Sequence, residues 1–263
     1  MKTSVYHITY YDYNQSLYIM FAKCNFRCLG CIRRRYVWDH HLYDRGGMES
    51  LRIEVFETLS LEEFKDIVGK VRVEKGLKRA VLGGGEPTAD PLFCEIVHCL
   101  ESMELEVAIL TNGFLLDKVM SCIPRNCVIE LSIKSIHPDK FSTYTGRGGD
   151  DLQIILKNMD TVYRSGLNLI VETVFIPNFN DVHDIELLAR YIASRLDSSV
   201  PMIIDEYVPV LTAPWRKPMF EELIEAKKRA EKYLEKVTVR SVYTMKPIGK
   251  VHQIYPDPTK HIL

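Results

Sequence analysis

Three cysteines near the start of the chain have the residue type and the spacing to hold a metal cluster. Cys24, Cys28 and Cys31 are separated by three and then two residues. Cysteine thiolates are the ligands that iron–sulfur clusters prefer. Three thiolates hold three irons of a 4Fe-4S cube and leave the fourth iron open to a second molecule. The spacing therefore predicts a 4Fe-4S cluster that does chemistry on a bound molecule, because a closed cluster would mainly pass electrons.

Two plainer interpretations of these cysteines stand beside the cluster. They are three incidental buried thiols, or they form a zinc site whose fourth ligand lies elsewhere, with His40 or His41 available for that position. Zinc sites more often show two C-x₂-C pairs, or one such pair with a histidine pair, and neither surrounds this segment. The open iron–sulfur cluster is the favoured interpretation.

The segments that must position the cysteines alternate between strands and helices. We predict strands over 17–22, 79–82, 105–110, 128–133, 167–176 and 202–208, with a further strand over 237–243. Helices are predicted over 61–73, 91–103, 116–120, 151–163, 181–195 and 218–236, with a capping box at Ser60 and Glu63 and an N-cap at Asp181. This pattern predicts an α/β fold, a partial (βα)6 TIM-like barrel with parallel strands. We expect one domain over 1–263, with the long segment 32–58 as a lid or docking segment.

Several short motifs follow directly after predicted strands. Gly83-Gly84-Gly85-Glu86-Pro87 follows the second strand, Thr111-Asn112-Gly113 the third, and Lys134 the fourth. A glycine run by itself is compatible with nothing more than a tight turn, because glycine tolerates positive φ. The carboxyl ends of parallel strands meet at one edge, however, so we expect these motifs to lie beside the cysteines.

Together these motifs resemble the radical S-adenosylmethionine (SAM) superfamily. Ile133-Lys134-Ser135, Tyr144-Thr145-Gly146 and 171–178 further resemble its branch of glycyl-radical-enzyme (pyruvate formate-lyase) activating enzymes. The resemblance implies that the cluster reductively cleaves SAM to a 5′-deoxyadenosyl radical, which abstracts hydrogen from a substrate. It implies metal ligation by Cys24, Cys28 and Cys31, and SAM contacts from Gly84, Gly85, Glu86, Thr111, Asn112, Ser132, Lys134 and Ile176.

The chain departs from the family pattern at three positions. Ser132 stands where an aspartate is usual, and Glu172 stands where an arginine is often found. Gly30 stands where the family usually has an aromatic residue that packs on the adenine of SAM. The apolar wall for adenine is then expected from Tyr36 or Trp38, or from the backbone together with Ile176 and Pro177. Trp38 is also interpreted as an ordinary anchor of its loop, because large aromatic side chains mostly pack.

The resemblance leaves the substrate open. It implies an oxidoreductase that receives electrons from reduced ferredoxin or flavodoxin, and Arg33-Arg34-Arg35 is a candidate docking patch. The partner to be activated would be a glycyl radical enzyme. The alternatives are modification of a small metabolite or an RNA, and, outside enzymes, an iron–sulfur electron carrier.

Composition restricts these possibilities. The 263 residues carry a formal net charge of −1, with 34 Lys plus Arg against 35 Asp plus Glu, which disfavours nucleic acid as a partner. No apolar run approaches the ~18 residues of a membrane span, and no signal pattern is present, so a cytoplasmic protein is expected. Because reducing compartments keep thiols free, the remaining cysteines are predicted to be buried thiols, with an auxiliary cluster as the alternative: Cys94, Cys99, Cys122 and Cys127.

Overall fold

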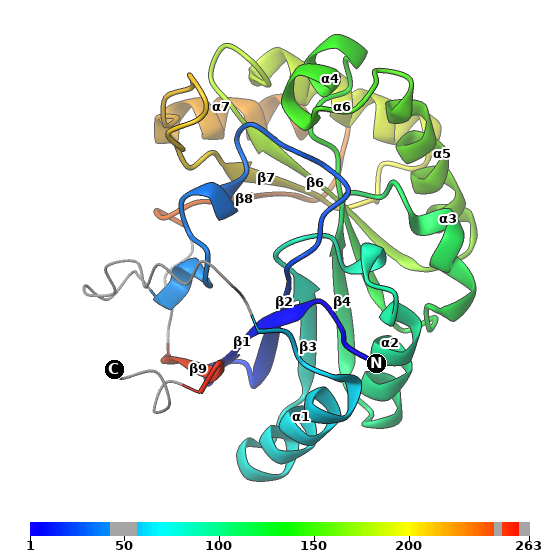
Figure 1. Cartoon of the computed structure of the whole chain (residues 1–263). Coiled ribbons are helices and arrows are strands. Elements are labelled where there is room, and N and C mark those ends of the chain that lie inside the picture. Colours follow the sequence, from blue (N-terminus) through cyan, green and yellow to red (C-terminus); the bar gives the residue numbers. More distant parts are fainter. Residues whose placement is uncertain (43–56, 245–248, 258–263) are drawn as a thin grey trace.

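The computed structural model describes residues 1–42, 57–244 and 249–257. Its strands form one sheet in the order β8-β7-β6-β5-β4-β3-β2-β1-β9, which curves around an open interior (Figure 1). Every pair from β2 to β8 is parallel. The strands are β1 (Val5–Tyr11), β2 (Ser16–Phe21), β3 (Arg79–Gly83), β4 (Glu106–Thr111), β5 (Val128–Ser132), β6 (Asn168–Phe175), β7 (Met202–Glu206), β8 (Val237–Arg240) and β9 (Val251–Tyr255).

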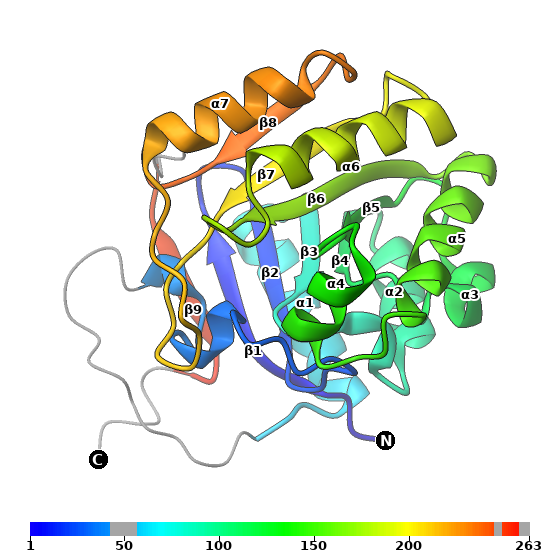
Figure 2. The same ribbon diagram turned by 90° about the horizontal axis from the view of Figure 1, so that it is seen from above.

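Helices cover the outer face of the curved sheet, as both Figure 1 and Figure 2 show. Short 3-10 turns lie at η1 (Ile32–Arg34), η2 (His40–Leu42), η3 (Pro87–Ala89) and η4 (Met120–Cys122). The α-helices are α1 (Leu61–Lys75), α2 (Phe93–Ser102), α3 (Leu116–Val119), α4 (Pro138–Thr145), α5 (Asp151–Arg164), α6 (Val182–Arg195) and α7 (Phe220–Ala230). The open strand–helix arrangement confirms the predicted partial barrel.

Alternation along the strands separates an apolar outer face from a more polar inner face. In β5, Ile129 and Leu131 are buried in the main apolar core, whereas Glu130 and Ser132 belong to a polar network. Successive side chains of a strand point to opposite faces, so a sequence such as Val-Ile-Glu-Leu-Ser covers a core and lines an interior at once. The polar inner face is therefore available for a site.

Local capping signals mark the helices as expected. The Ser60 hydroxyl accepts the Glu63 N–H while the Glu63 carboxylate accepts the Ser60 N–H, which completes the predicted capping box at α1. Asp181 caps α6 by accepting the His183 N–H. The predicted helix over 218–236 was too long: α7 ends at Ala230, although its charged residues continue beyond that point.

The N-terminal edge of the sheet was not predicted. β1 pairs antiparallel with β2 on one side and with β9 on the other, so a strand near the C-terminus closes this edge. Pairing between such distant segments leaves no local sequence signal. Of the predicted 32–58 segment, residues 43–56 lie outside the described part. None of the described helices has the length and apolar character needed to cross a membrane.

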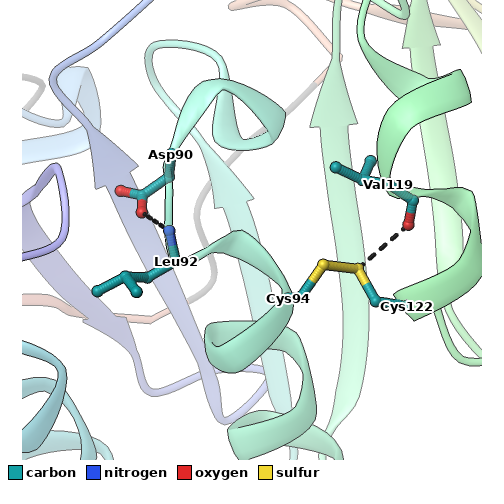
Figure 3. The surroundings of a disulfide bond; sticks show 5 residues. All are labelled: Asp90, Leu92, Cys94, Val119 and Cys122. Atoms are coloured by element: carbon teal, nitrogen blue, oxygen red, sulfur yellow. Dashed lines mark hydrogen bonds between the residues drawn. A yellow bond between two sulfur atoms is a disulfide. The ribbon is translucent and has the colours of Figure 1, made fainter.

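The structure corrects the prediction for two of the remaining cysteines. Cys94 on α2 and Cys122 in η4 form a disulfide, with their Cα atoms 5.5 Å apart (Figure 3). That separation lies within the ordinary range for a disulfide. The prediction considered only chain spacing, and it could not foresee that α2 and η4 pack side by side. Cys99 and Cys127 are buried free thiols, as predicted.

Removing this disulfide is expected to destabilise the fold. The bond closes a loop with a sequence separation of 28, for which chain entropy predicts about 3.5 kcal/mol. The double variant Cys94→Ala/Cys122→Ala should therefore melt about 10 °C below the wild type under non-oxidising, thiol-free conditions. Differential scanning calorimetry measures the difference. Dithiothreitol should lower the melting temperature of the wild type toward that of the variant and leave the melting temperature of the variant unchanged. Alkylation of the wild-type protein, denatured without reductant, should modify five thiols. Modification of all seven would contradict the bond.

Candidate functional site

The three predicted ligands lie around one cavity at the carboxyl ends of the strands. Cys24, Cys28 and Cys31 are free thiols, and all three line a cavity of about 270 Å³. The backbone segment Gly84-Gly85 forms another part of its wall. Burial raises the pKa of Cys24, and it raises that of Cys28 to about 12, against the opposing charge of Lys134. The fold thus brings together the cysteine motif and the glycine motif, which are more than fifty residues apart in the chain.

The spacing of the sulfurs fits a cluster better than a single ion. Within the described residues, three His, Cys, Asp or Glu ligand atoms lie within 4.8 Å of one another only at Asp39, His40 and His41. A tetrahedral zinc ion bound at 2.3 Å would bring its sulfurs to about 3.8 Å from one another. The three cysteine sulfurs do not all lie within 4.8 Å of one another, so they are spread more widely than the ligands of one zinc ion, and neither His40 nor His41 completes such a set with them.

Two buried donors without hydrogen-bond partners lie in the cysteine segment, one on Arg33, which lines the cavity, and one on Asn25, which follows Cys24. Asn25 Nδ2 and Arg33 Nε are buried and find no acceptor in the described part of the chain. The Phe26 N–H already donates to Cys24 Sγ at 3.4 Å. Hydrogen bonds to the sulfurs are one way in which proteins tune iron–sulfur clusters. A 4Fe-4S cluster in this cavity would offer these donors thiolate and sulfide acceptors, so the residues present fit the cluster.

The glycine run is required for backbone packing. A Cβ on Gly85 would lie 2.2 Å from the Lys23 carbonyl oxygen and 2.5 Å from that of Phe21, and the next amide, Glu86 N–H, donates to the Lys23 oxygen at 2.8 Å. Gly84 has φ +83°, which favours glycine. The sequence interpretation offered a tight turn and contacts with SAM as the two explanations of these glycines. The structure adds an internal reason, because the β3 loop must press against the backbone that leads into Cys24.

The Glu86 side chain holds two rim loops together. Its carboxylate is buried and accepts hydrogen bonds from the Thr111 hydroxyl at 2.6 Å and the Asn112 N–H at 2.7 Å, as well as from the Thr88 hydroxyl and N–H. Asn112 in turn donates from Nδ2 to Asn25 Oδ1 at 2.7 Å. Burial raises the pKa of Glu86, and the four donors oppose that rise. Glu86, Thr111 and Asn112 thus link the loops after β3 and β4 to Asn25 in the cysteine loop, which the sequence alone did not indicate.

Glu86→Gln is expected to lower the free energy of unfolding by about 2 kcal/mol. The amide would have to place an NH₂ group against one set of these donors, because only one of its two ends accepts hydrogen bonds. Denaturant unfolding of the cluster-free protein measures the loss without depending on activity. Glu95→Gln on the exposed side of α2 is the matched control and should stay within about 0.5 kcal/mol of the wild type. Equal stability of both variants would show that Glu86 is not a structural link.

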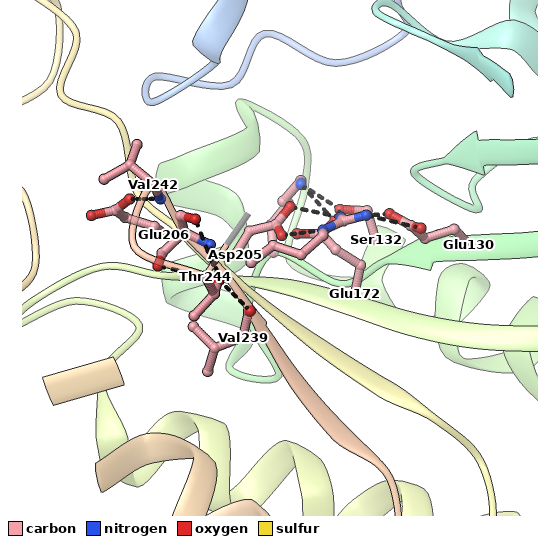
Figure 4. A network of polar contacts seen from close by, with 11 residues as sticks. Glu130, Ser132, Glu172, Asp205, Glu206, Val239, Val242 and Thr244 are labelled. Atoms are coloured by element: carbon pink, nitrogen blue, oxygen red, sulfur yellow. Dashed lines mark hydrogen bonds and ion pairs between the residues drawn. The ribbon is translucent and has the colours of Figure 1, made fainter. Parts of the chain in front are cut away.

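Ser132 at the end of β5 and Glu172 within β6, both labelled in Figure 4, form one polar group with Lys134. Ser132 and Glu172 are paired residues in the sheet; the Ser132 hydroxyl donates to the Glu172 carboxylate and accepts from Lys134 Nζ. Lys134 Nζ also lies 3.4 Å from Glu172. Burial alone would lower the pKa of Lys134, but Glu172, Cys28 and Asp205 raise it above its usual value. The carboxylate absent at position 132 is therefore supplied by the neighbouring strand.

The polar group continues along the inner face of β5, β7 and β8. The Arg240 guanidinium donates to both oxygens of Asp205, at 2.6 and 2.8 Å, and to both oxygens of Glu130, at 2.6 and 3.2 Å. Burial and the charge of Glu172 raise the pKa of Asp205 to about 6, against the effect of Arg240. Sequence reasoning missed these residues, although the alternation in Val128–Ser132 places Glu130 on the polar face with Ser132.

The space beside Gly30 is filled by aromatic rings from other elements. A Cβ on Gly30 would lie 2.9 Å from a ring carbon of Tyr144 and 2.9 Å from one of Tyr207. These tyrosines form a buried group with Val174 and Ile176, against which Phe179 and Trp215 pack. Ile176 is fully buried there. Trp38, in contrast, packs with Tyr6 and Met20, as expected for an anchor of its loop.

The three arginines after Cys31 mainly hold the loop. Arg33 donates to the Ala22 carbonyl at 3.1 Å, Arg34 to that of Cys28 at 3.0 Å, and Arg35 to that of Pro209 at 3.1 Å. Arg34 and Arg35 are exposed, and Arg33 and Arg34 line the cavity. The predicted basic patch is therefore present near the cysteines, and each arginine also has a structural role.

Curated relatives carry related sequences over part of their length. The GTP 3′,8-cyclase of Synechocystis sp. (strain ATCC 27184 / PCC 6803 / Kazusa) is 28% identical over 169 residues, which is 63% of this chain and 46% of the relative. The GTP 3′,8-cyclase of Brucella ovis is 26% identical over 207 residues, which is 72% of this chain and 55% of the relative. The chain thus spans about half the length of the curated relatives it matches.

Solved structures share the fold. Streptococcus suis SuiB bound to S-adenosylmethionine aligns with a TM-score of 0.63 and 13% identity, over 83% of this chain and 48% of SuiB. A radical SAM methyltransferase from Sphaerobacter thermophilus aligns with a TM-score of 0.63 and 18% identity, over 90% and 70%. A domain of a pyruvate-formate lyase-activating enzyme from Bacteroides vulgatus aligns with a TM-score of 0.50 and 23% identity, over 62% and 99%. The family model of the radical SAM superfamily matches residues 18–192, the cysteine motif included, and the chain belongs to the radical SAM superfamily.

Proposed function

We propose that Cys24, Cys28 and Cys31 hold a 4Fe-4S cluster, and that the chain uses SAM bound beside it to remove a hydrogen atom from a small polar substrate inside the open barrel. The observation that carries this proposal is the single cavity lined by three free thiols and by the Gly84-Gly85 backbone. When bound, the cluster supplies one electron to the sulfonium of SAM, which releases methionine and a 5′-deoxyadenosyl radical.

The residues of this chain would bind and orient the cofactors. The cavity-lining backbone of Gly84 and Gly85 would accept hydrogen bonds from the SAM ammonium. Lys134, whose side chain is 21% exposed and lies close enough to Cys28 to affect its pKa, would contact the SAM carboxylate. The apolar group around Ile176 would shelter the adenine and exclude water, because a carbon radical reacts with any nearby hydrogen donor.

The inner face supports a small polar substrate. Glu130, Glu172 and Asp205 place three carboxylates there, against the two cations Lys134 and Arg240. Such a wall, in which each carboxylate is paired with Lys134 or Arg240, offers hydrogen-bond partners to a polar substrate group. The similarity to GTP 3′,8-cyclases supports a small molecule over a protein loop.

Deuterium transfer tests this proposal. The reconstituted enzyme is reduced with dithionite without oxygen and given SAM with a deuterated cell extract, split by ultrafiltration into small molecules and proteins. We expect deuterium in 5′-deoxyadenosine with the small-molecule fraction and none with the protein fraction. Label from the protein fraction alone would overturn the small substrate and favour activation of a glycyl radical enzyme. A fully loaded cluster with no 5′-deoxyadenosine in any fraction would favour an electron carrier.

A further inference from the structure

A second group of ligand-type side chains lies on the inner face of β1, apart from the cysteines. Asp39, His40 and His41 are consecutive residues at the turn η2. Asp39 Oδ1 lies 2.9 Å from His41 Nδ1 and 3.9 Å from His40 Nδ1. The Asp39 side chain is fully buried, whereas the His40 and His41 side chains are 42% and 33% exposed. Two imidazole nitrogens thus lie within 4 Å of one carboxylate oxygen, and His41 Nδ1 also lies 2.9 Å from the Tyr11 hydroxyl.

The other oxygen of Asp39 is held by hydroxyl groups of β1. Asp39 Oδ2 accepts hydrogen bonds from the Thr9 hydroxyl at 2.6 Å and from the Tyr11 hydroxyl. Burial would raise the pKa of Asp39, but the bonds from His41, Thr9 and Tyr11 outweigh burial and lower it. One oxygen is thereby fixed from behind while the other faces the histidines. Outer hydrogen bonds of this kind orient the ligands of metal sites.

We propose that Asp39, His40 and His41 bind a divalent first-row transition-metal ion. Their ligand atoms all lie within 4.8 Å of one another, which within the described residues occurs nowhere else. Metal–ligand bonds of 2.0–2.2 Å to nitrogen and oxygen place neighbouring ligands about 3 Å apart, so a small movement of His40 closes the set. Two imidazoles with one carboxylate suit iron(II), cobalt(II) and zinc.

An uncommitted imidazole nitrogen lies close by. His7 is fully buried, and together with Thr9 and Tyr11 it occupies every second position along β1. Its Nδ1 is 2.7 Å from the Tyr255 carbonyl oxygen, while Nε2 is buried and has no hydrogen-bond partner in the described part of the protein. Its ring lies 4.9 Å from that of Trp38, the residue before Asp39, and the Asp39 charge acts on it. The exposed faces of His40 and His41 would leave positions on the metal for water or for an oxygen-bearing ligand.

Cobalt(II) alone is the probe for this site. It is added to the cluster-loaded, oxidised protein, whose three cluster cysteines are already occupied, and bound metal is counted by mass spectrometry after equilibrium dialysis. We expect about one cobalt per chain with no loss of cluster iron. His40→Gln and His41→Gln should each raise the Kd for cobalt more than 10-fold, and Tyr11→Phe, which removes an outer hydrogen bond, about 10-fold. His98→Gln, an exposed histidine on α2, is the matched control and should bind as the wild type does.

Thermal melting separates loss of metal from loss of fold. Cobalt should raise the melting temperature of the wild type and of His98→Gln, but not that of His41→Gln. Should His41→Gln fail to fold, His40→Gln decides, because His40 is more exposed and makes no short bond to Asp39. No cobalt beyond the cluster site, or unchanged Kd values in both histidine variants, would show that Asp39 only fastens the loop to β1. Neither result depends on SAM cleavage, so failure here leaves the proposed function untouched.

Discussion

Cys28→Ala is expected to abolish cluster binding and 5′-deoxyadenosine formation. Two remaining thiolates would have to hold a cube that fits three, and the cavity offers no other sulfur in the described residues. Even outer-shell changes at metal sites typically cost 10–100-fold, so loss of a direct ligand should exceed about 100-fold. Iron and sulfide content after anaerobic reconstitution, together with the electron paramagnetic resonance of the reduced protein, measures the result.

A buried cysteine elsewhere provides the control for Cys28. Cys99→Ala removes a free thiol on α2, far from the cavity lining, and should leave iron content and SAM cleavage near the wild-type level. The melting temperature of each cluster-free variant should stay close to that of the wild type, because Cys28→Ala removes only packing by the thiol and keeps the carbonyl that accepts from Arg34. A Cys28→Ala protein that keeps four irons and cleaves SAM would refute the ligand assignment.

Gly85→Ala is expected to give the largest loss of stability of any single methyl addition at the site. The new Cβ would meet two carbonyl oxygens of the backbone at 2.2 and 2.5 Å, and neither can move as a flexible side chain would. Overpacking usually costs 1–3 kcal/mol, and contacts this close place the cost at about 3 kcal/mol or more. The melting temperature of the cluster-free protein should fall by about 6–12 °C. Cluster loading should fall too, because the displaced backbone leads into Cys24.

The same substitution within a helix should have the opposite sign. Gly69 lies inside α1, and a Cβ there would only touch Met103 at 4.0 Å. Gly69→Ala is expected to stabilise the protein by about 0.5–1 kcal/mol, because alanine loses less backbone entropy in a helix. If Gly85→Ala melts within 2 °C of Gly69→Ala, the close approach between the β3 loop and the cysteine loop is not real.

The partial barrel and its rim were predictable because their signals are local. Apolar runs such as 79–82 and 105–110, each followed by a turn motif, place their ends on one edge whatever the details of packing. The cysteine spacing likewise carries its meaning within eight residues. β9 escaped prediction, since its pairing with β1 joins residues about 240 positions apart and depends on no local pattern.

Departures from the family pattern could not be judged from the sequence. Ser132 and Glu172 look like two separate losses in the chain, but they are paired residues on adjacent strands and share one hydrogen bond. Gly30 looks like a missing aromatic ring, but Tyr144 and Tyr207 occupy the space beside it. These contacts join residues on different strands and helices, so they cannot be predicted from the order of residues along the chain.

The cysteine motif, the glycine turn and the order of strands and helices could be predicted from the sequence, because each of these depends on neighbouring residues. What the side chains do once the strands lie side by side became visible in the folded chain. The tertiary structure made Glu86 a link between two loops, joined Cys94 to Cys122, and set Asp39 against Thr9 and Tyr11. Contacts between distant segments arise from the packing of the whole sheet, and that packing is a property of three-dimensional arrangement rather than of any local pattern.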